Sequence, residues 1–178
     1  LTITDDDTSA FSVADVSVDE DGTTATITVA ASNAFSGNVT INYATSNGTA
    51  TAGSDYTAAS GTLTFTAGQT SKTFTVGVLA DSTDEVNETV TLTLSSPTNA
   101  TISDSTGTLT ITDDDDAPTL SINDVTAANE NAANSTFTVS LSAASAKEIT
   151  VAYATSNGTA TTAGSDYTAA SGTLTFTA

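Results

Sequence analysis

The sequence has no cysteine and no histidine among its 178 residues. The first absence excludes disulfide bonds, thiolate metal sites and thiol nucleophiles, and the second removes the commonest catalytic base and zinc ligand. Basic residues are scarce too, since Lys72 and Lys147 stand against 21 acidic residues and leave a formal net charge of −19. A chain of this charge repels phosphate groups, so we expect neither nucleic acid nor an anionic membrane surface as a partner.

Long apolar runs are also missing. None approaches the roughly 20 residues that cross a bilayer, so direct membrane insertion is not expected. The composition is nevertheless that of a folded protein, because 38% of the residues are hydrophobic and the mean hydropathy is +0.02, which is too apolar for an acidic disordered tail. Leu1 already lies in a strand-like pattern, so we expect no signal peptide here and a chain that is a segment of a longer protein.

An internal repeat is the strongest feature of the sequence. The segment YATSNGTATAGSDYTAASGTLTFTA begins at Tyr43 and returns at Tyr153 with one inserted threonine, a spacing of 110 residues. The run LTITDDD at residues 1–7 returns at residues 109–115. A period of about 110 residues is the size of a whole β-sandwich domain and too long for a solenoid unit. The sequence therefore predicts a tandem array of similar domains.

The acids that follow the second LTIT run mark the predicted domain boundary. Four successive aspartates, Asp113–Asp116, are followed by an Ala-Pro pair and by a new strand pattern from Leu120, which is typical of a boundary between domains. We therefore predict that residues 1–7 are the last strand of a preceding domain, residues 8–116 a complete domain, and residues 117–178 the first half of the next.

Apolar residues alternate with threonine and serine through the complete domain, which is the period-two pattern of half-buried β-strands. About seven strands are predicted, with apolar positions at Phe11 and Val13; Ile27 and Val29; Val39, Ile41 and Tyr43; Leu63 and Phe65; Phe74, Val76 and Val78; Val90, Leu92 and Leu94; and Leu109 and Ile111. Strands with one apolar face and short turns predict two antiparallel sheets packed face to face. The predicted fold class is all-β, with tandem immunoglobulin-like antiparallel β-sandwiches.

The last part of the chain repeats only the first four of these strands. Its apolar positions are Leu120, Ile122, Phe137, Val139, Leu141, Ile149, Val151, Tyr153, Leu174 and Phe176. Without the last three strands its inner faces would be exposed to water. Two alternatives stay open: the chain continues and supplies the missing strands, which we favour, or a neighbouring molecule donates them.

The carboxylates of the complete domain gather near strand ends. They lie before the second strand, in the segments GSDY and ADSTDEVNE, and after the last strand. Loops between alternate strands of a sandwich lie at the same end, so these acids are candidates for one rim. Two unit charges about 5 Å apart in water repel by roughly 0.8 kcal/mol, so a cluster needs a counter-charge. Oxygen ligands without nitrogen or sulfur favour Ca²⁺, whereas a solvated acidic stretch is the simpler alternative for any single run.

Several segments occur together in the order found in one known family. They are GTATAGSDY at residues 48–56, GTLTF at residues 61–65, GQTSKTF at residues 68–74, DSTDEVNE at residues 81–88 and DDD at residues 113–115. On these segments the chain resembles the Calx-beta domain family along essentially its whole length. The resemblance implies an immunoglobulin-like sandwich that binds Ca²⁺ ions at one end, where the next domain begins.

The resemblance also implies a set of calcium ligands. In the complete domain the family's pattern falls on Glu20, Asp55, Asp81, Glu85, Glu88, Asp113, Asp114 and Asp115. In the last part of the chain only Glu130 and Asp166 correspond, and Asp5, Asp6 and Asp7 would belong to the site of a preceding domain. One position departs, because Ala80 stands where family members with strong sites often carry another aspartate.

The predicted function is structural. We expect a calcium-binding segment of a long extracellular tandem-repeat protein, such as a bacterial adhesin stalk or surface filament, in which Ca²⁺ stiffens the joints between domains. The expected partners are neighbouring repeats, with homotypic filament contacts as a further option, and the expected location is the cell surface or the secreted fraction. The alternative is a regulatory calcium sensor of a membrane-associated protein. Catalysis is not expected, because the acids are clustered and aromatic sugar platforms are missing.

Two further residue types are predicted to have structural roles only. Tyr43 is in phase with the apolar positions of its strand, and Tyr56 lies in GSDY, so both are expected to pack against the core. Lys72 and Lys147 are expected near strand edges, where a lysine discourages pairing with another sheet.

Overall fold

The computed structural model describes residues 8–126 and 134–178. Within the described residues the chain divides into two compact units, the first formed by residues 8–82 and 87–114, and the second by residues 83–86, 115–126 and 134–178. The strand predicted at residues 1–7 lies outside the described residues. Across the two described ranges, no helix combines the length and the apolar composition needed to cross a membrane.

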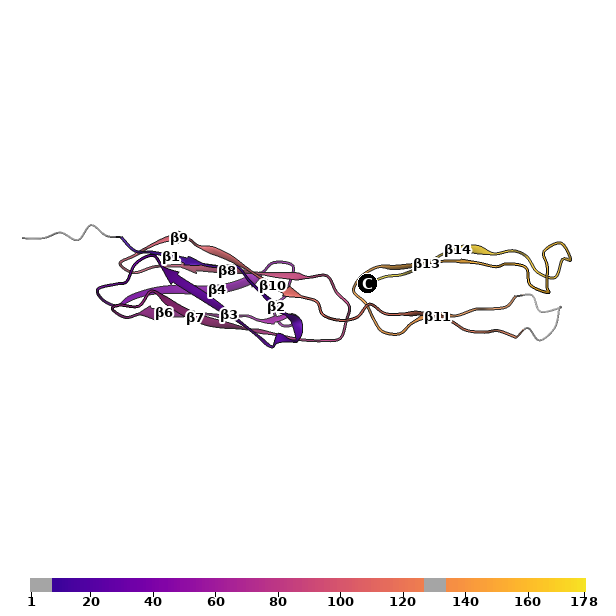
Figure 1. The fold of residues 1–178 in the computed structure, drawn as a ribbon, viewed down its shortest axis with the longest axis horizontal. Coiled ribbons are helices and arrows are strands. Elements are labelled where there is room, and N and C mark those ends of the chain that lie inside the picture. The colour runs from indigo at the N-terminus through magenta and orange to yellow at the C-terminus, as the bar shows by residue number, and fades with distance from the viewer. Residues whose placement is uncertain (1–7, 127–133) are drawn as a thin grey trace, which may run out of the picture. The chain divides into compact units, whose positions relative to one another are not determined.

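The first unit consists of two five-stranded sheets (Figure 1). One has the order β5 (Tyr56–Thr57), β7 (Ser71–Val78), β3 (Thr24–Ala31), β1 (Ala10–Val13) and β9 (Thr101–Asp104). The other has the order β2 (Val16–Asp19), β10 (Thr106–Thr112), β8 (Glu88–Ser95), β4 (Val39–Asn47) and β6 (Ser60–Phe65). A 3-10 turn, η1 (Glu20–Gly22), follows β2.

The core consists of the apolar faces of these strands. In β3, Ala25, Ile27 and Val29 are buried while the threonines between them are exposed, because successive side chains of a strand point to opposite faces. Three phenylalanines from distant segments meet in this core, Phe11, Phe35 and Phe65, with ring centroids 5.3, 5.0 and 5.9 Å apart. In each strand the apolar residues therefore lie on the face that packs in the core, and the threonines lie on the solvent-exposed face.

The predicted all-β sandwich is confirmed, and all seven predicted strands are present as β1, β3, β4, β6, β7, β8 and β10. The strands β2, β5 and β9 were not predicted separately, because none is longer than four residues. Two pairings are parallel, β9 with β1 and β2 with β10, whereas the sequence predicted antiparallel sheets throughout. Both pairings occur where the chain changes sheets, between β1 and β2 and on either side of β9. The alternation of apolar residues within one strand does not reveal such a change.

The two tyrosines of the first unit pack as predicted. Tyr43 stacks on Phe74, with ring centroids 4.0 Å apart and planes 16° from parallel. Tyr56 is fully buried, and its hydroxyl donates to Asn47 Oδ1 at 2.8 Å. Both rings therefore belong to the packing of the sandwich.

The second unit contains two separate two-stranded sheets. The strand β11 (Leu120–Ile122) pairs with β12 (Val139–Leu141), and β13 (Ile149–Ala154) pairs with β14 (Ser171–Phe176), both antiparallel. The pairing of β13 with β14 repeats that of β4 with β6, because Tyr153 lies opposite Gly172 as Tyr43 lies opposite Gly61. The repeated sequence thus forms the same antiparallel strand pair in each unit.

Equivalent side chains are far less covered in the second unit. Tyr153 is 42% exposed there, and Leu120, Ile122, Phe137 and Leu174 are exposed as well. Within the described residues, the apolar faces of this unit are thus largely exposed. This agrees with the prediction that a unit without the last three strands leaves its inner faces uncovered.

The repeat offers a matched test of this difference at Phe65 and its counterpart Phe176. Phe65 is fully buried, whereas Phe176 is only half-buried. We predict that Phe65→Ala lowers the free energy of unfolding of the first unit by about 3–5 kcal/mol through lost burial and a new cavity. Phe176→Ala removes the same atoms at smaller cost. Urea unfolding of both variants of the full chain measures this, and equal losses would contradict the assignment of the core.

Candidate metal centre

The strand registers of one sheet bring acidic strand ends together. The strand β2 runs parallel to β10 with Asp19 opposite Thr112, so the next residues, Glu20 and Asp113, follow the two strands at neighbouring positions. The hydroxyl of Thr112 donates to Asp19 Oδ1 at 2.7 Å and to the Val18 carbonyl at 3.0 Å, which ties the two strand ends. The pairing of β2 with β10 thus brings Glu20 and Asp113 close together.

The other sheet contributes Asp55 and the acidic segment after β7. The strand β5 pairs with β7 with Tyr56 opposite Val78, and the backbone N–H of Leu79 donates to the Asp55 carbonyl at 3.0 Å. The N–H of Val78 donates to the carbonyl of Thr23, directly after η1, at 3.0 Å. Asp55, the end of β7 and η1 are therefore neighbours. The segment then reaches the sheet that contains β2 and β10, because β8 of that sheet begins at Glu88.

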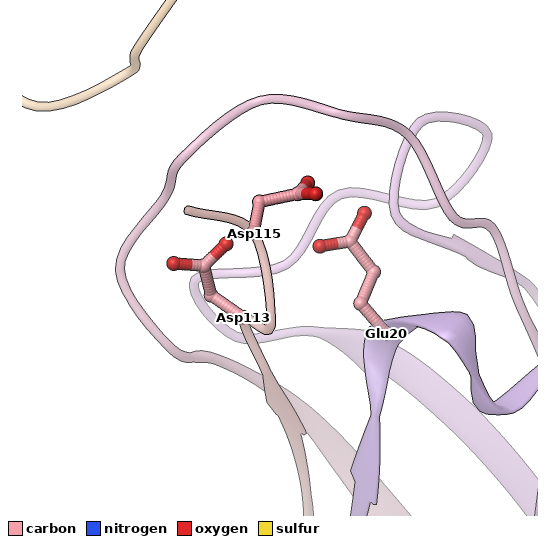
Figure 2. Close-up of side chains that lie close together, drawn as sticks. All are labelled: Glu20, Asp113 and Asp115. Atoms are coloured by element: carbon pink, nitrogen blue, oxygen red, sulfur yellow. The ribbon is translucent and has the colours of Figure 1, made fainter. Parts of the chain in front are cut away.

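Three carboxylates form what we call the Glu20 group: Glu20, Asp113 and Asp115. One oxygen of each lies within 4.8 Å of the others. Figure 2 shows Glu20 reaching the group from η1, and Asp113 and Asp115 from the segment after β10. Glu20 is only 8% exposed, and its Oε1 accepts the backbone N–H of Asp81 at 2.9 Å. The charge of this group therefore sits at a partly desolvated strand end.

A second set, which we call the Asp55 group, consists of Asp55, Glu85 and Glu88. One carboxylate oxygen of each again lies within 4.8 Å of the others, and all three side chains are half-buried. The orientation of Asp55 is fixed, because its Oδ2 accepts the backbone N–H of Thr51 at 2.6 Å.

Both groups fit a hard divalent cation. Oxygens that bind one Ca²⁺ ion at about 2.3–2.6 Å lie up to roughly 5 Å apart, and the oxygens of each group lie within 4.8 Å of one another. The ligand atoms are all carboxylate oxygens, which suit Ca²⁺ and not the softer transition metals. Without a cation, each pair at this distance repels by roughly 0.9 kcal/mol even at the dielectric constant of water.

The structure gathers six of the predicted ligands, Glu20, Asp55, Glu85, Glu88, Asp113 and Asp115, into these two groups. Neither group contains the exposed side chains of Asp81 and Asp114, although the backbone of Asp81 contacts Glu20. Asp166 is exposed, and its Oδ2 accepts the N–H of Thr161 at 2.9 Å. Glu130, Asp5, Asp6 and Asp7 lie outside the described residues. All ligand assignments stay predictions.

Sequence analysis missed the contact between Asp84 and Lys147 in the second unit. Asp84 is 5% exposed, and its Oδ1 lies 2.6 Å from Lys147 Nζ, while the hydroxyl of Ser145 donates to Oδ2 at 2.8 Å. The hydrogen bond from Lys147, followed by that from Ser145, lowers the pKa of Asp84 below its usual value of 3.8, so this carboxylate is ionised at neutral pH. Lys147, for which no role beyond edge protection was predicted, thus has a buried acid as partner. The only signal for this contact in the sequence is that Lys147 is one of just two basic residues in the chain.

Comparison with known proteins places this arrangement in a family. The family model described as Calx-beta domain matches residues 3–115 and again residues 113–178. A solved structure of CBD12 from CALX1.2 is 26% identical with a TM-score of 0.58, covering 94% of this chain and 71% of that one. The calcium binding domain CBD12 of CALX1.1 is 25% identical with a TM-score of 0.57, covering 94% and 70%. The apo-form Calx CBD1 domain is 24% identical with a TM-score of 0.57, and the match covers 61% of this chain and 100% of that one. At this identity it supports the fold alone. No curated protein matches the chain.

Repulsion within the Asp55 group gives a prediction for the protein in EDTA. We expect Glu88→Gln to raise the free energy of unfolding by about 1 kcal/mol, because one charge is removed from two neighbours. The gain should shrink in about 1 M NaCl, where screening is strong. Chemical unfolding at low and high salt measures both, with Glu148→Gln as the control, since Glu148 is exposed and outside both groups. Destabilisation by Glu88→Gln in EDTA would contradict the repulsion.

Proposed function

Because the chain belongs to the Calx-beta domain family, we propose that it binds Ca²⁺ ions through the Glu20 group and the Asp55 group. The observation that carries the proposal is the gathering of six carboxylates into two sets whose oxygens lie within 4.8 Å. These side chains lie at or close to the ends of strands of both sheets. A bound ion supplies positive charge to strand ends that otherwise repel one another, so binding stabilises the fold.

We propose a structural role for this binding in a long extracellular protein. The family matches two adjacent stretches of the chain, and the repeated segment is nearly identical in both, as in a stalk built from copies of one domain. Neighbouring repeats are the main partners, homotypic contacts between filaments are secondary, and the location is the cell surface or the secreted fraction. External calcium near millimolar concentration fills sites of the weak extracellular class, so such a stalk is stiff outside the cell.

A regulatory calcium sensor is the second candidate. The similarity to the calcium binding domain CBD12 of CALX1.1, across 94% of this chain, favours it. The two roles differ in what calcium does to a pair of domains: a stalk becomes stiffer in one arrangement, whereas a sensor moves between two arrangements. Single-molecule distance measurements between the units, in EDTA and in calcium, distinguish the two roles. Calcium narrows the distribution of distances in a stalk, whereas it shifts the mean distance in a sensor.

Calcium binding itself is tested by thermal unfolding of the full chain. We expect about 1 mM Ca²⁺ to raise the midpoint by several degrees over EDTA, since a ligand that binds only the folded state stabilises it by RT ln(1 + [L]/Kd). Glu20→Gln and Glu88→Gln, one from each group, should each remove part of the rise, and together nearly all of it.

Asp21→Asn is the matched control for these variants. Asp21 follows Glu20 directly, is exposed and belongs to neither group, so its loss changes the net charge equally without removing a ligand. A rise that survives the double variant, or that Asp21→Asn reduces as much, would overturn the assignment.

A further inference from the structure

The sheet edges of the first unit differ in how they are protected from pairing with another chain. An edge strand presents unpaired backbone N–H and C=O groups, and proteins blunt such edges with short strands, charged side chains, proline or β-bulges. The edge strands here are β5 and β9 in one sheet and β2 and β6 in the other. The strand β5 has two residues, while β2 and β9 have four each and end at Asp19 and Asp104. The strand β6 has none of these protections.

The strand β6 is long, regular and uncharged. Its six residues read SGTLTF, and they pair with β4 in one unbroken register. The uncharged stretch extends beyond the strand, because no charged residue lies between Asp55 and Lys72. The strand β14 of the second unit has the same six-residue sequence and also lies at the edge of its sheet. Each repeat thus carries the same uncharged strand at a sheet edge.

Alternate residues of β6 direct their backbone groups away from β4. The N–H of Thr45 donates to the Ala59 carbonyl at 2.9 Å, just before β6 begins. Hydrogen-bonded residues alternate in an antiparallel pair, so the backbone groups of Ser60, Thr62 and Thr64 point to the free side. Among the described residues, β4 is the one strand that pairs with β6. The free side of β6 can therefore accept a further strand.

We propose that β6 is a docking edge for a second copy of this chain, which adds its own β6 in antiparallel orientation. A two-fold interface uses the same surface on both molecules, and main-chain hydrogen bonds between added strands supply affinity. In the register with the fullest overlap, Thr62 lies opposite Thr62 of the second copy, and Ser60 lies opposite its Thr64. The outward backbone groups of the two strands then meet as hydrogen-bonded pairs.

The charge of the chain favours this edge as the contact between copies. Two molecules of net charge −19 repel one another, and the repulsion is weakest where the approaching surfaces carry no acid. The strand β6 offers such a surface, whereas the Glu20 group and the Asp55 group lie at strand ends. Several weak contacts add up when a tandem array repeats the strand. The inference rests on the stalk of the proposed function, whose homotypic contacts it assigns to a surface, and it involves no calcium ligand.

The absence of cysteine allows a single-cysteine test of this edge. Thr62→Cys places a thiol on the proposed two-fold axis, where opposite Cα atoms lie about 5.5 Å apart, a distance that a disulfide spans. Thr26→Cys is the matched control, because Thr26 is an exposed threonine of β3, which has a strand on either side. Non-reducing electrophoresis of the full chain, equilibrated with reduced and oxidised glutathione in EDTA, measures the linked dimer.

We expect roughly tenfold more dimer from Thr62→Cys than from Thr26→Cys at about 0.5 M NaCl, where screening weakens the repulsion between copies. Adding Thr64→Pro to Thr62→Cys should abolish the excess, because proline removes an outward N–H and leaves the bonds to β4 in place. Thr64→Val keeps that N–H and should keep the excess. The thermal midpoint of each variant shows whether it folds, and the two cysteine variants decide the proposal if Thr64→Pro does not.

Equal dimer yields from the two cysteines would overturn the docking edge, as would a dimer that folded Thr64→Pro leaves intact. Calcium binding is tested separately by the thermal midpoint in Ca²⁺. A chain that gains stability from calcium but does not cross-link through Thr62→Cys refutes the docking edge alone. A chain that cross-links but gains no stability from calcium refutes the calcium sites alone.

Discussion

Repulsion between carboxylates at the strand ends is the constraint on which the rest of the structure depends. The registers that bury the core also place acids together, since pairing Asp19 with Thr112 brings Glu20 next to Asp113. The sandwich therefore cannot form its sheets without concentrating negative charge at one end. Two lysines in a chain of net charge −19 cannot compensate it, and one of them is already held by Asp84. The proposed Ca²⁺ ions would supply the counter-charge that the two lysines cannot.

Much of the fold could be predicted from the sequence, because alternation with period two is a local property of each strand. Strands such as β3 and β8, with apolar residues at every second position, therefore appeared in the pattern. The short strands β2, β5 and β9 and the two parallel pairings could not, because they depend on where the chain changes sheets. The acids could likewise be found one by one. Their division into two groups, with Asp81 and Asp114 outside both, depends on the register between strands distant in sequence. The contact of Asp84 with Lys147 spans 63 residues and has no local signal.

The repeats show how surroundings alter the role of one sequence. Tyr43 is stacked on Phe74 and Phe65 is buried, whereas their counterparts Tyr153 and Phe176 lie in the equivalent strand pair and are far more exposed. Divergence between repeats is more informative than identity, since Ser145 replaces Phe35 at a position that contacts an acid.

The central claim is that the crowded carboxylates hold calcium, and a crystal structure of the full chain grown with CaCl₂ tests it most directly. The account predicts anomalous density for an ion within about 2.3–2.6 Å of carboxylate oxygens of Glu20, Asp113 and Asp115, and for another among Asp55, Glu85 and Glu88. The same residues turned into solvent, with no ion at either group in millimolar calcium, would contradict it.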